Sequence, residues 1–159
     1  MLRRSFPQFS TDGFNMSDPG SEGRLAALFA ALDAAFAGDA LRNQALPSTV
    51  PASGLLIQND GDPGAPEYLL SPLQYEYTHP VEILIFVQAG SDGERRPVAT
   101  AARTALGAAI EADRTLGGLC DWVDIVHVGH DEIPIEGAAP VRQDTLRATL
   151  TYSLTTPLA

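Results

Sequence analysis

The sequence predicts an α+β fold in which two helices pack on a largely antiparallel, twisted β-sheet within a single domain. Two segments, 24–36 and 97–110, have apolar residues at helical spacing, and each is followed by stretches rich in β-branched and aromatic residues. The resulting order of helix, strands, helix, strands lacks the regular alternation of parallel α/β folds. A chain of 159 residues suits one hydrophobic core.

The first predicted helix begins near Arg24, and its apolar residues share one face. Ser21 stands where a hydroxyl caps the free amides of a first turn, and Glu22 stands where the helix dipole favours a negative charge. Gly38 follows as the predicted stop. The apolar face consists of Leu25, Leu28, Phe29, Leu32, Ala35 and Phe36.

Short strands are predicted after this helix. Residues 39–52 contain Pro47 and Pro51 and are interpreted as a connection. The stretch GLLIQ at 54–58 has the composition of a short buried strand, and NDGDPGAP at 59–66 predicts a turn. This part of the chain therefore contributes one strand to the predicted sheet.

Two prolines, Pro72 and Pro80, interrupt the next segment, 68–87. Because proline removes a hydrogen-bond donor from the ladder, this segment is predicted as an edge or bulged strand and not as one uninterrupted central strand. Its second half, VEILIFV at 81–87, is the best strand of the sequence by composition.

The second predicted helix begins at Pro97, a residue favoured in a first turn, after a turn at 89–97. Three charged residues, Arg103, Glu111 and Asp113, are predicted to point away from the sheet. The apolar face, rich in small residues that allow close packing, consists of Val98, Ala101, Ala102, Ala105, Leu106, Ala109 and Ile110.

Two strands and a loop complete the predicted fold. LCDWVDIVHV at 119–128 is a strand by composition, and residues 129–141, with two prolines and two glycines, are predicted to loop out. TLRATLTYSLT at 145–155 alternates cleanly and predicts a long final strand. Its apolar face consists of Leu146, Ala148, Leu150, Tyr152 and Leu154.

Residues 1–20 are predicted to form an N-terminal arm, and residues 21–159 the single domain. The arm mixes Ser, Asp, Gly, Pro and Asn with Phe6, Phe9 and Phe14, a composition that cannot form an amphipathic element alone. Two interpretations stay open. The aromatic residues anchor the arm on a neighbouring subunit, or Met16 is the real start of the protein.

Charge and composition exclude several classes of function. The net charge is -10, and all basic side chains are arginines without a cluster, which argues against a tight nucleic-acid binder. The lone cysteine, Cys120, excludes an internal disulfide and suits a reducing compartment. No signal peptide and no stretch of roughly 20 apolar residues is found, so neither secretion by that route nor a membrane span is predicted.

One cluster, His127, His130, Asp131 and Glu132, has the residue types of a metal site. Residues three apart on a strand point to opposite faces, so the two histidines are not expected to meet, and no metal is predicted. Cys120 is interpreted as a small apolar residue packed beside Trp122 and not as a nucleophile, because no neighbour in the sequence activates its thiol.

The remaining candidates have equally ordinary interpretations. The acid pairs, Asp121 with Asp124 and Asp131 with Glu132, are interpreted as surface residues, and the glycines of GDPG and GSDG as turns. The sequence thus predicts a protein that is not an enzyme, with no catalytic, cofactor-binding or metal-binding residues and no cofactor. Such a chain works through its surface, so oligomerisation is expected.

Three stretches resemble a known family. RPVATAARTALGAAIEADRTLGGLCDWVDI at 96–125 resembles the helix, TLGG turn and acidic strand of tail terminator and tail completion proteins of long-tailed phages and gene transfer agents. TLRATLTYSLTT resembles that family's closing strand, and VEILIFVQ its strand before the second helix. The resemblance covers residues 24–156, tolerates a variable loop at 129–141, and leaves the arm outside.

The resemblance implies a virion structural protein at the head–tail junction, assembled in the host cytoplasm. It would form a homo-oligomeric ring, hexameric in this family, that caps the tail tube protein, stops its polymerisation and joins a head-tail connector or stopper protein. DNA would pass the lumen without sequence-specific binding, and an acidic wall would give it little to adhere to. Two alternatives remain, a head–tail connector or neck component, and a small enzyme using Cys120 or the cluster from His127 to Glu132.

Overall fold

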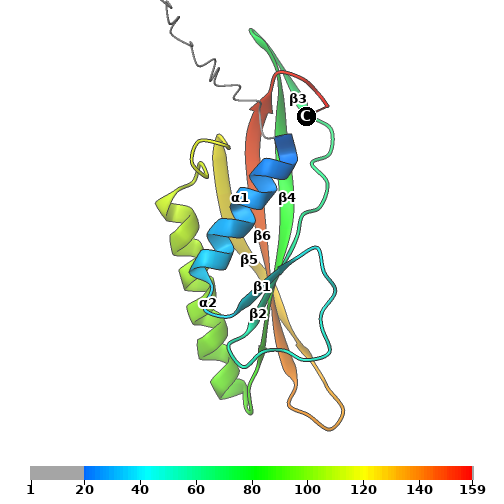
Figure 1. Cartoon of the computed structure of the whole chain (residues 1–159), viewed down its shortest axis with the longest axis vertical. Helices are drawn as coiled ribbons and strands as arrows, with labels where there is room; N and C mark the ends of the chain where they lie inside the picture. Colours follow the sequence, from blue (N-terminus) through cyan, green and yellow to red (C-terminus); the bar gives the residue numbers. More distant parts are fainter. Residues whose placement is uncertain (1–19, 159) are drawn as a thin grey trace, which may run out of the picture.

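The computed structural model describes residues 20–158 and confirms the α+β class: two helices cover one face of a six-stranded, mostly antiparallel sheet (Figure 1). The strand order is β1-β2-β4-β6-β5, β3 pairs with one end of β4, and only β1 and β2 run parallel. The elements are α1 (Gly20–Ala35), β1 (Asp39–Arg42), β2 (Leu55–Asn59), β3 (Glu67–Leu70), β4 (Leu73–Gln88), α2 (Asp92–Ala112), β5 (Trp122–Ile133) and β6 (Val141–Leu154).

The centre of the sheet is the long antiparallel pair β4 and β6, which are in register from Tyr75 opposite Leu154 to Gln88 opposite Val141. Side chains alternate along each strand, so every second residue points toward the helices. On β6 these are the five apolar residues that the alternation predicts, and all five are buried in the main core. On β4 they include Tyr77, Val81, Ile83, Ile85 and Val87.

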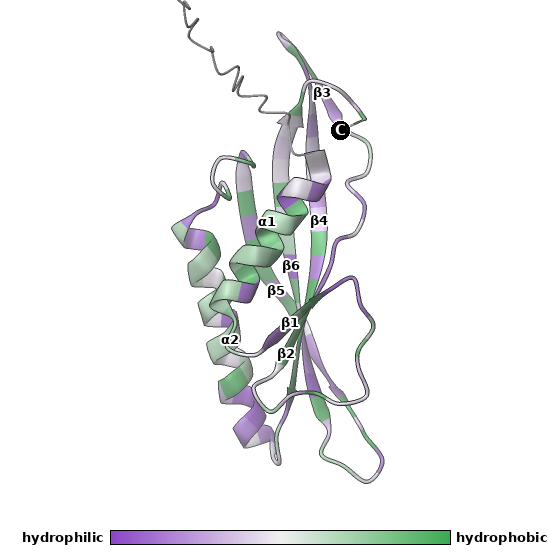
Figure 2. Cartoon of the chain, in the orientation of Figure 1, coloured by the Kyte–Doolittle hydropathy of each residue, from purple (hydrophilic) through white to green (hydrophobic). Residues whose placement is uncertain are grey.

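Helix α1 packs on this core through the predicted apolar spacing, with Leu25, Leu28 and Leu32 buried. Its outer surface is also largely apolar because alanines occupy it (Figure 2). The predicted cap is wrong: Ser21 lies inside the helix, which begins at Gly20, the last residue assigned to the predicted arm. The rest of that arm, with Phe6, Phe9, Phe14 and Met16, lies outside the described residues.

Helix α2 begins five residues earlier than predicted, at Asp92, so Pro97 lies inside it. The reason is a capping box. Glu94 Oε2 accepts hydrogen bonds from the Ser91 amide (2.8 Å) and the Ser91 hydroxyl (2.9 Å), which fixes the first turn. The segment interpreted as a turn at 89–97 therefore contains the helix start.

One row of residues on α2 faces a different side from the one predicted. Leu106 and Ile110 are buried as expected, together with Ala99. Arg103, predicted to point outward, instead reaches the sheet and pairs with Asp144. The rotation that brings Arg103 inward turns Val98 and Ala101 outward, and both are exposed.

The sequence interpretation missed β1, which lies within the predicted connection and pairs in parallel with β2. Its four residues, Asp-Ala-Leu-Arg, are too few to carry a strand signal of their own. Gly38, the predicted stop, has a different role: a Cβ there would lie 2.3 Å from the Gly54 carbonyl oxygen, so glycine permits this close approach of two backbones.

The expectation of an edge or bulged strand around Pro80 is wrong, because β4 runs without interruption from Leu73 to Gln88 and pairs with β6 from Tyr75 onward. Strand β4 is central, yet the pairing with β3 ends at Glu76 and the pairing with β2 begins at Glu82. Pro80 therefore lies where β6 is the only described strand beside β4. The N–H that proline lacks is missing on the side without a described strand, so no hydrogen bond of a ladder is lost. Pro72 lies in the turn between β3 and β4, as its effect on pairing predicts.

Strand β5 is longer than predicted and the loop after it shorter, because residues 129–133 continue the ladder against β6. A register shift between His127 and Gly129 marks a β-bulge, where one extra residue enters the strand. The extra residue shifts the phase of the alternation, so the sequence pattern breaks at the bulge and predicts the loop too early.

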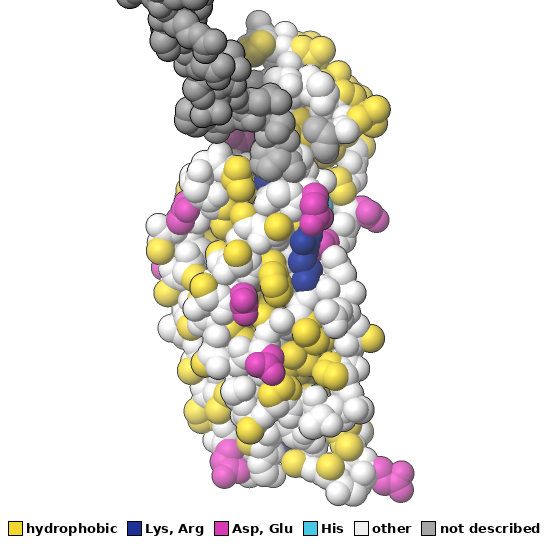
Figure 3. Space-filling view, in the orientation of Figure 1, with side chains coloured by type: hydrophobic (Ala, Val, Ile, Leu, Met, Phe, Trp, Pro, Cys, Tyr) yellow, Lys and Arg dark blue, Asp and Glu magenta, His cyan; other side chains and the backbone are white. Residues whose placement is uncertain are grey.

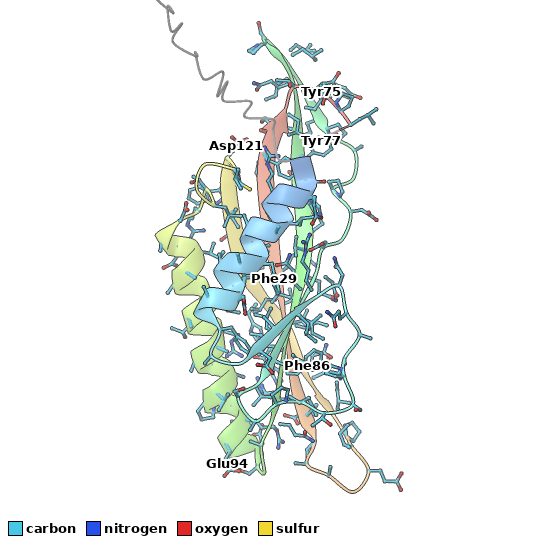
Figure 4. All side chains as sticks on the ribbon, in the orientation of Figure 1. Phe29, Tyr75, Tyr77, Phe86, Glu94 and Asp121 are labelled. Carbon is cyan, nitrogen blue, oxygen red and sulfur yellow. The ribbon has the colours of Figure 1, made fainter. Side chains whose placement is uncertain are left out.

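A second, smaller core lies on the sheet face that the helices leave free. Val50, from the loop that joins β1 and β2, is buried against this face. The residues under it are Leu55, Ile57, Phe86 and Val141. This loop covers only one end of the face, and Phe86 marks that end in Figure 4.

Candidate assembly surfaces

The β3–β4 hairpin projects beyond the rest of the molecule and carries large apolar side chains into solvent (Figure 1). Tyr68, Leu70 and Leu73 are 66%, 82% and 53% exposed. With Tyr75 they share one face of the two-stranded ribbon, the face that continues into the core at Tyr77. In Figure 3, hydrophobic side chains gather at this end.

The other face of the ribbon is mainly polar, with Leu69 as its apolar member. Glu67 stands directly opposite Glu76, a like-charge pair that disfavours contact with an acidic partner. Tyr68 and Tyr75 meet edge to face on the apolar side, with ring centroids 5.6 Å apart. The hairpin is therefore amphipathic, and its apolar face lies beyond the start of α1, where no described residue covers it.

An apolar groove of about 370 Å³ lies between the end of α1 and the first half of α2. The outward row of α2 forms one wall, and Ser53 is the polar member of the lining. No charged side chain lines this groove. The apolar lining includes Phe36, Val87, Val98, Ala101, Ala102 and Ala105.

The uncovered part of the sheet has a third apolar stretch along β5. Trp122, Val126 and Val128 are each about half exposed, Val128 as the extra residue of the bulge. The guanidinium of Arg114 lies 4.8 Å from the centroid of the Trp122 ring and covers one side of it. β5 has no described strand on its outer side, so its backbone offers an edge for strand addition.

A buried polar network holds α2 against β6. The Asp144 side chain has no exposed surface. Its carboxylate accepts a hydrogen bond of 2.7 Å from Arg142 Nε and also forms an ion pair with Arg103. Arg95, likewise buried, donates to the Ala89 carbonyl at 2.9 Å and pairs with Glu132 at 3.1 Å. These charges are paired within the subunit, so they serve the packing of α2 and not a ligand.

A second network surrounds Asp60, which follows β2. Burial tends to raise the pKa of this carboxyl, but hydrogen bonds from Arg42, Gln58 and Asn43 outweigh burial and hold the pKa below its usual range. Hydrogen bonds to Glu22 and to the Asp60 carboxyl raise the pKa of Arg42 further above its usual value. The network joins the start of α1 to β1 and the turn after β2.

His79 is buried beside this network. Its Nε2 lies 2.8 Å from the Asp60 carbonyl oxygen, and its Nδ1 lies 3.2 Å from the Tyr152 hydroxyl. A carbonyl can only accept, so Nε2 carries the proton and the tyrosine donates to Nδ1. Both ring nitrogens are thus engaged within the fold.

The predicted separation of His127 and His130 is wrong. The bulge between them restores both rings to one face, where they stack with centroids 6.5 Å apart and an angle of 12°. Asp131 takes the opposite face, and Glu132 is drawn into its ion pair with Arg95. Over residues 20–158, no three His, Cys, Asp or Glu side chains gather closely enough to hold a metal ion.

Cys120 lies in the main core, whereas Trp122 lies on the uncovered sheet face, so the two residues are on different sides of the sheet. Burial raises the pKa of the Cys120 thiol to about 11, and a thiol of that pKa is a poor nucleophile at neutral pH. The acids near it have structural partners: Asp121 accepts 3.1 Å from the Ser153 hydroxyl, and Asp124 pairs with Arg114 at 3.1 Å.

The three apolar surfaces were not predicted from the sequence, although two left a signal. The apolar stripe of α2 is wider than one sheet-facing row needs, because Val98, Ala101 and Ala105 form a second row along the groove. The YLLSPLQY stretch at 68–75 is apolar on both sides of a proline, which is unusual for a turn that ends in solvent.

Comparison with known proteins finds distant structural likeness. No protein-family model matches the chain, and no curated protein matches it. Among solved structures, a chain of "Virion of native gene transfer agent (GTA) particle" is similar, with 12% identity and a TM-score of 0.38, covering 80% of this chain and 93% of that one. Neither described helix is long and apolar enough to cross a membrane.

Proposed function

We propose that this chain is a structural virion protein, the subunit of a tail terminator ring of the phage type. The observation that carries the proposal is the pair of apolar features, hairpin and groove, that an isolated subunit leaves exposed. Exposed apolar surface of this kind indicates a protein partner. The sequence resemblance at 96–125 and 145–156 supplies the kind of assembly.

In this role, copies of the chain form a closed ring, hexameric as in the family that the sequence resembles. One rim of the ring binds the end of the tail tube and stops its polymerisation, and the other meets the head-side connector. The protein then resides in the virion at the head–tail junction after assembly in the host cytoplasm. It performs no catalysis and needs no cofactor.

The charge of the chain suits a channel for DNA. With 20 acidic and 10 basic residues, a ring carries a large negative charge, which disfavours adhesion of a passing polyanion. Acidic side chains are scattered over the face seen in Figure 3 and do not form one patch there. Which face lines the lumen follows from the ring contacts.

Assembly on tail tubes tests the proposal. Purified protein is mixed with tail tube protein of the same particle, and tube length is followed by negative-stain electron microscopy with the protein's native mass in parallel. We expect rings at one end of each tube and tubes that stop growing at substoichiometric protein. Tubes that grow to the same length with and without the protein would contradict the terminator role.

The head–tail connector is distinguished in the same experiment. A connector binds the head-side portal assembly and leaves the growth of isolated tubes unchanged. A matched control is tube protein mixed with an unrelated acidic protein of similar size, which separates specific capping from a general effect of negative charge.

A further inference from the structure

We infer that copies of this chain associate head to tail, with the apolar face of the β3–β4 hairpin of one copy inserted into the groove between α1 and α2 of the next. This inference rests on the proposed ring and names the surfaces that build it. Its two partners are the face of Tyr68, Leu70 and Leu73 and the groove walled by Val98 and Ala101.

The two surfaces match in chemistry. From Leu69 to Gln74 the hairpin carries no charge, and no charged side chain lines the groove. Contact between them therefore removes apolar area from water without burying an unpaired charge, whose desolvation would oppose association. An acidic or basic partner segment would lose this advantage in the groove.

The two surfaces also match in shape. The hairpin presents large side chains on a narrow ribbon, whereas three alanines, Ala101, Ala102 and Ala105, leave the wall of the groove hollow. At about 30 Å³ per water molecule, a volume of about 370 Å³ holds roughly a dozen waters. That space accommodates more than one apolar side chain from the hairpin.

The position of the two surfaces excludes contact within one chain. Both are attached to β4: Leu73 opens the strand at the hairpin, and Val87 near its other end lines the groove. At about 3.3 Å per residue, these residues are roughly 46 Å apart. Figure 4 shows Tyr75, beside the hairpin, and Glu94, in the first turn of α2, at opposite ends of the molecule.

A contact between different surfaces of two identical chains leaves one hairpin and one groove free, and each recruits a further copy. Repetition through a rotation that closes gives a ring, and this is the arrangement we infer. The polar face of the hairpin, with Glu67 and Glu76, stays in solvent on the outside of the contact.

Mixing two charged variants tests the contact. Leu70→Asp spoils the hairpin and Ala101→Glu spoils the groove; both sites are exposed, so both variants fold. Each variant alone should associate at least about tenfold more weakly than the wild type, because a charge must enter an apolar contact. Mixed together they should form pairs, one of each, that do not grow, since one intact hairpin meets one intact groove.

Cross-linking provides a second, independent readout. Leu70→Cys with Ala101→Cys should yield covalent dimers and larger species on oxidation, while the wild type, with only the buried Cys120, should not. The matched control is Leu70→Cys with Thr104→Cys, which is exposed on the other flank of α2 and should stay uncross-linked. Cross-links from Leu70→Cys alone would indicate a hairpin-to-hairpin contact and overturn the inference.

The outcomes separate this inference from the proposed function. If both charged variants form rings as the wild type does, and the cysteine pair gives no cross-links, the hairpin contact is overturned and the terminator role is left standing. The N-terminal segment or the tube protein would then be the occupant of the groove. A wild type that stops at two copies would overturn the head-to-tail arrangement. A wild type that never assembles, even on tubes, would overturn both.

Discussion

Arg103 of α2 is ion-paired with Asp144 of β6, and this carboxylate has no exposed surface. Arg142 approaches the same carboxylate from its own strand, with Nε 2.7 Å from Oδ1. With Arg103 facing the sheet, the row of Val98 and Ala101 faces outward and lines the groove.

Asp144→Ala should therefore destabilise the fold strongly. Removing one partner of a buried ion pair leaves the other charge unpaired, and we expect a loss of about 3–5 kcal/mol in the free energy of unfolding. Urea denaturation followed by circular dichroism measures it. Arg147→Ala, an exposed position on the same strand, is the control and should change stability by less than about 0.5 kcal/mol.

Cys120 should resist alkylation in the folded protein. Its thiol is buried and its pKa is raised to about 11, so little thiolate exists or is accessible near pH 8. Iodoacetamide labelling followed by mass spectrometry should show slow modification in buffer and rapid modification in denaturant. Rapid labelling of the native protein would contradict this expectation and support the alternative in which Cys120 acts as a nucleophile.

The Asp60 network should make stability depend on acid pH. The pKa of Asp60 is lower in the folded than in the unfolded state, so its contribution is fully present above the usual aspartate pKa of about 3.9 and is lost as pH falls through the folded value. Asp60→Asn should flatten this part of the stability profile, measured by urea denaturation from pH 7 to pH 3. An unchanged acid slope in the variant would show that other carboxylates produce it.

Two glycines should respond oppositely to alanine. Gly38→Ala places a Cβ 2.3 Å from the Gly54 carbonyl oxygen, and we expect a loss of about 1–3 kcal/mol through overpacking. Gly107 lies in α2 with open space where an alanine Cβ would lie, so Gly107→Ala should gain about 0.5–1 kcal/mol from helix propensity. Thermal unfolding of the two variants beside the wild type measures both signs.

The fold class and its central strands were predictable because their signals are periodic. The alternation from Leu146 to Leu154 specifies a half-buried strand whatever surrounds it, and the result is the helix-facing side of β6. The run at 81–87 identified half of β4, and the helical spacing after Arg24 identified α1.

The failures share a physical cause, which is that local patterns do not record tertiary partners. β1 is only four residues long and forms because β2 offers it an edge in parallel. The bulge at Val128 shifts the phase of β5, so His127 and His130 come to share a face that simple alternation denies them. Arg103 points inward only because Asp144, 41 residues later, lies under it.

The start of α2 could have been found. Ser91 and Glu94 have the spacing of a capping box and mark the helix start better than Pro97 does. The assembly surfaces could not, because exposure depends on where the body of the protein ends. Leu70 is exposed to solvent because the hairpin projects beyond the rest of the protein, and a short stretch of sequence does not record that position.

The position of β6 between β4 and β5 also governs when the protein can fold. This strand occupies residues 141–154, and both of its neighbours precede it in the sequence. A nascent chain that has emerged only through Ile133 has β5 without its ladder and a long β4 open along one side. Because β6 completes the sheet, the sheet can close only after residues 141–154 have left the ribosome, so premature association between the apolar edges of unfinished copies is the hazard that its synthesis has to avoid.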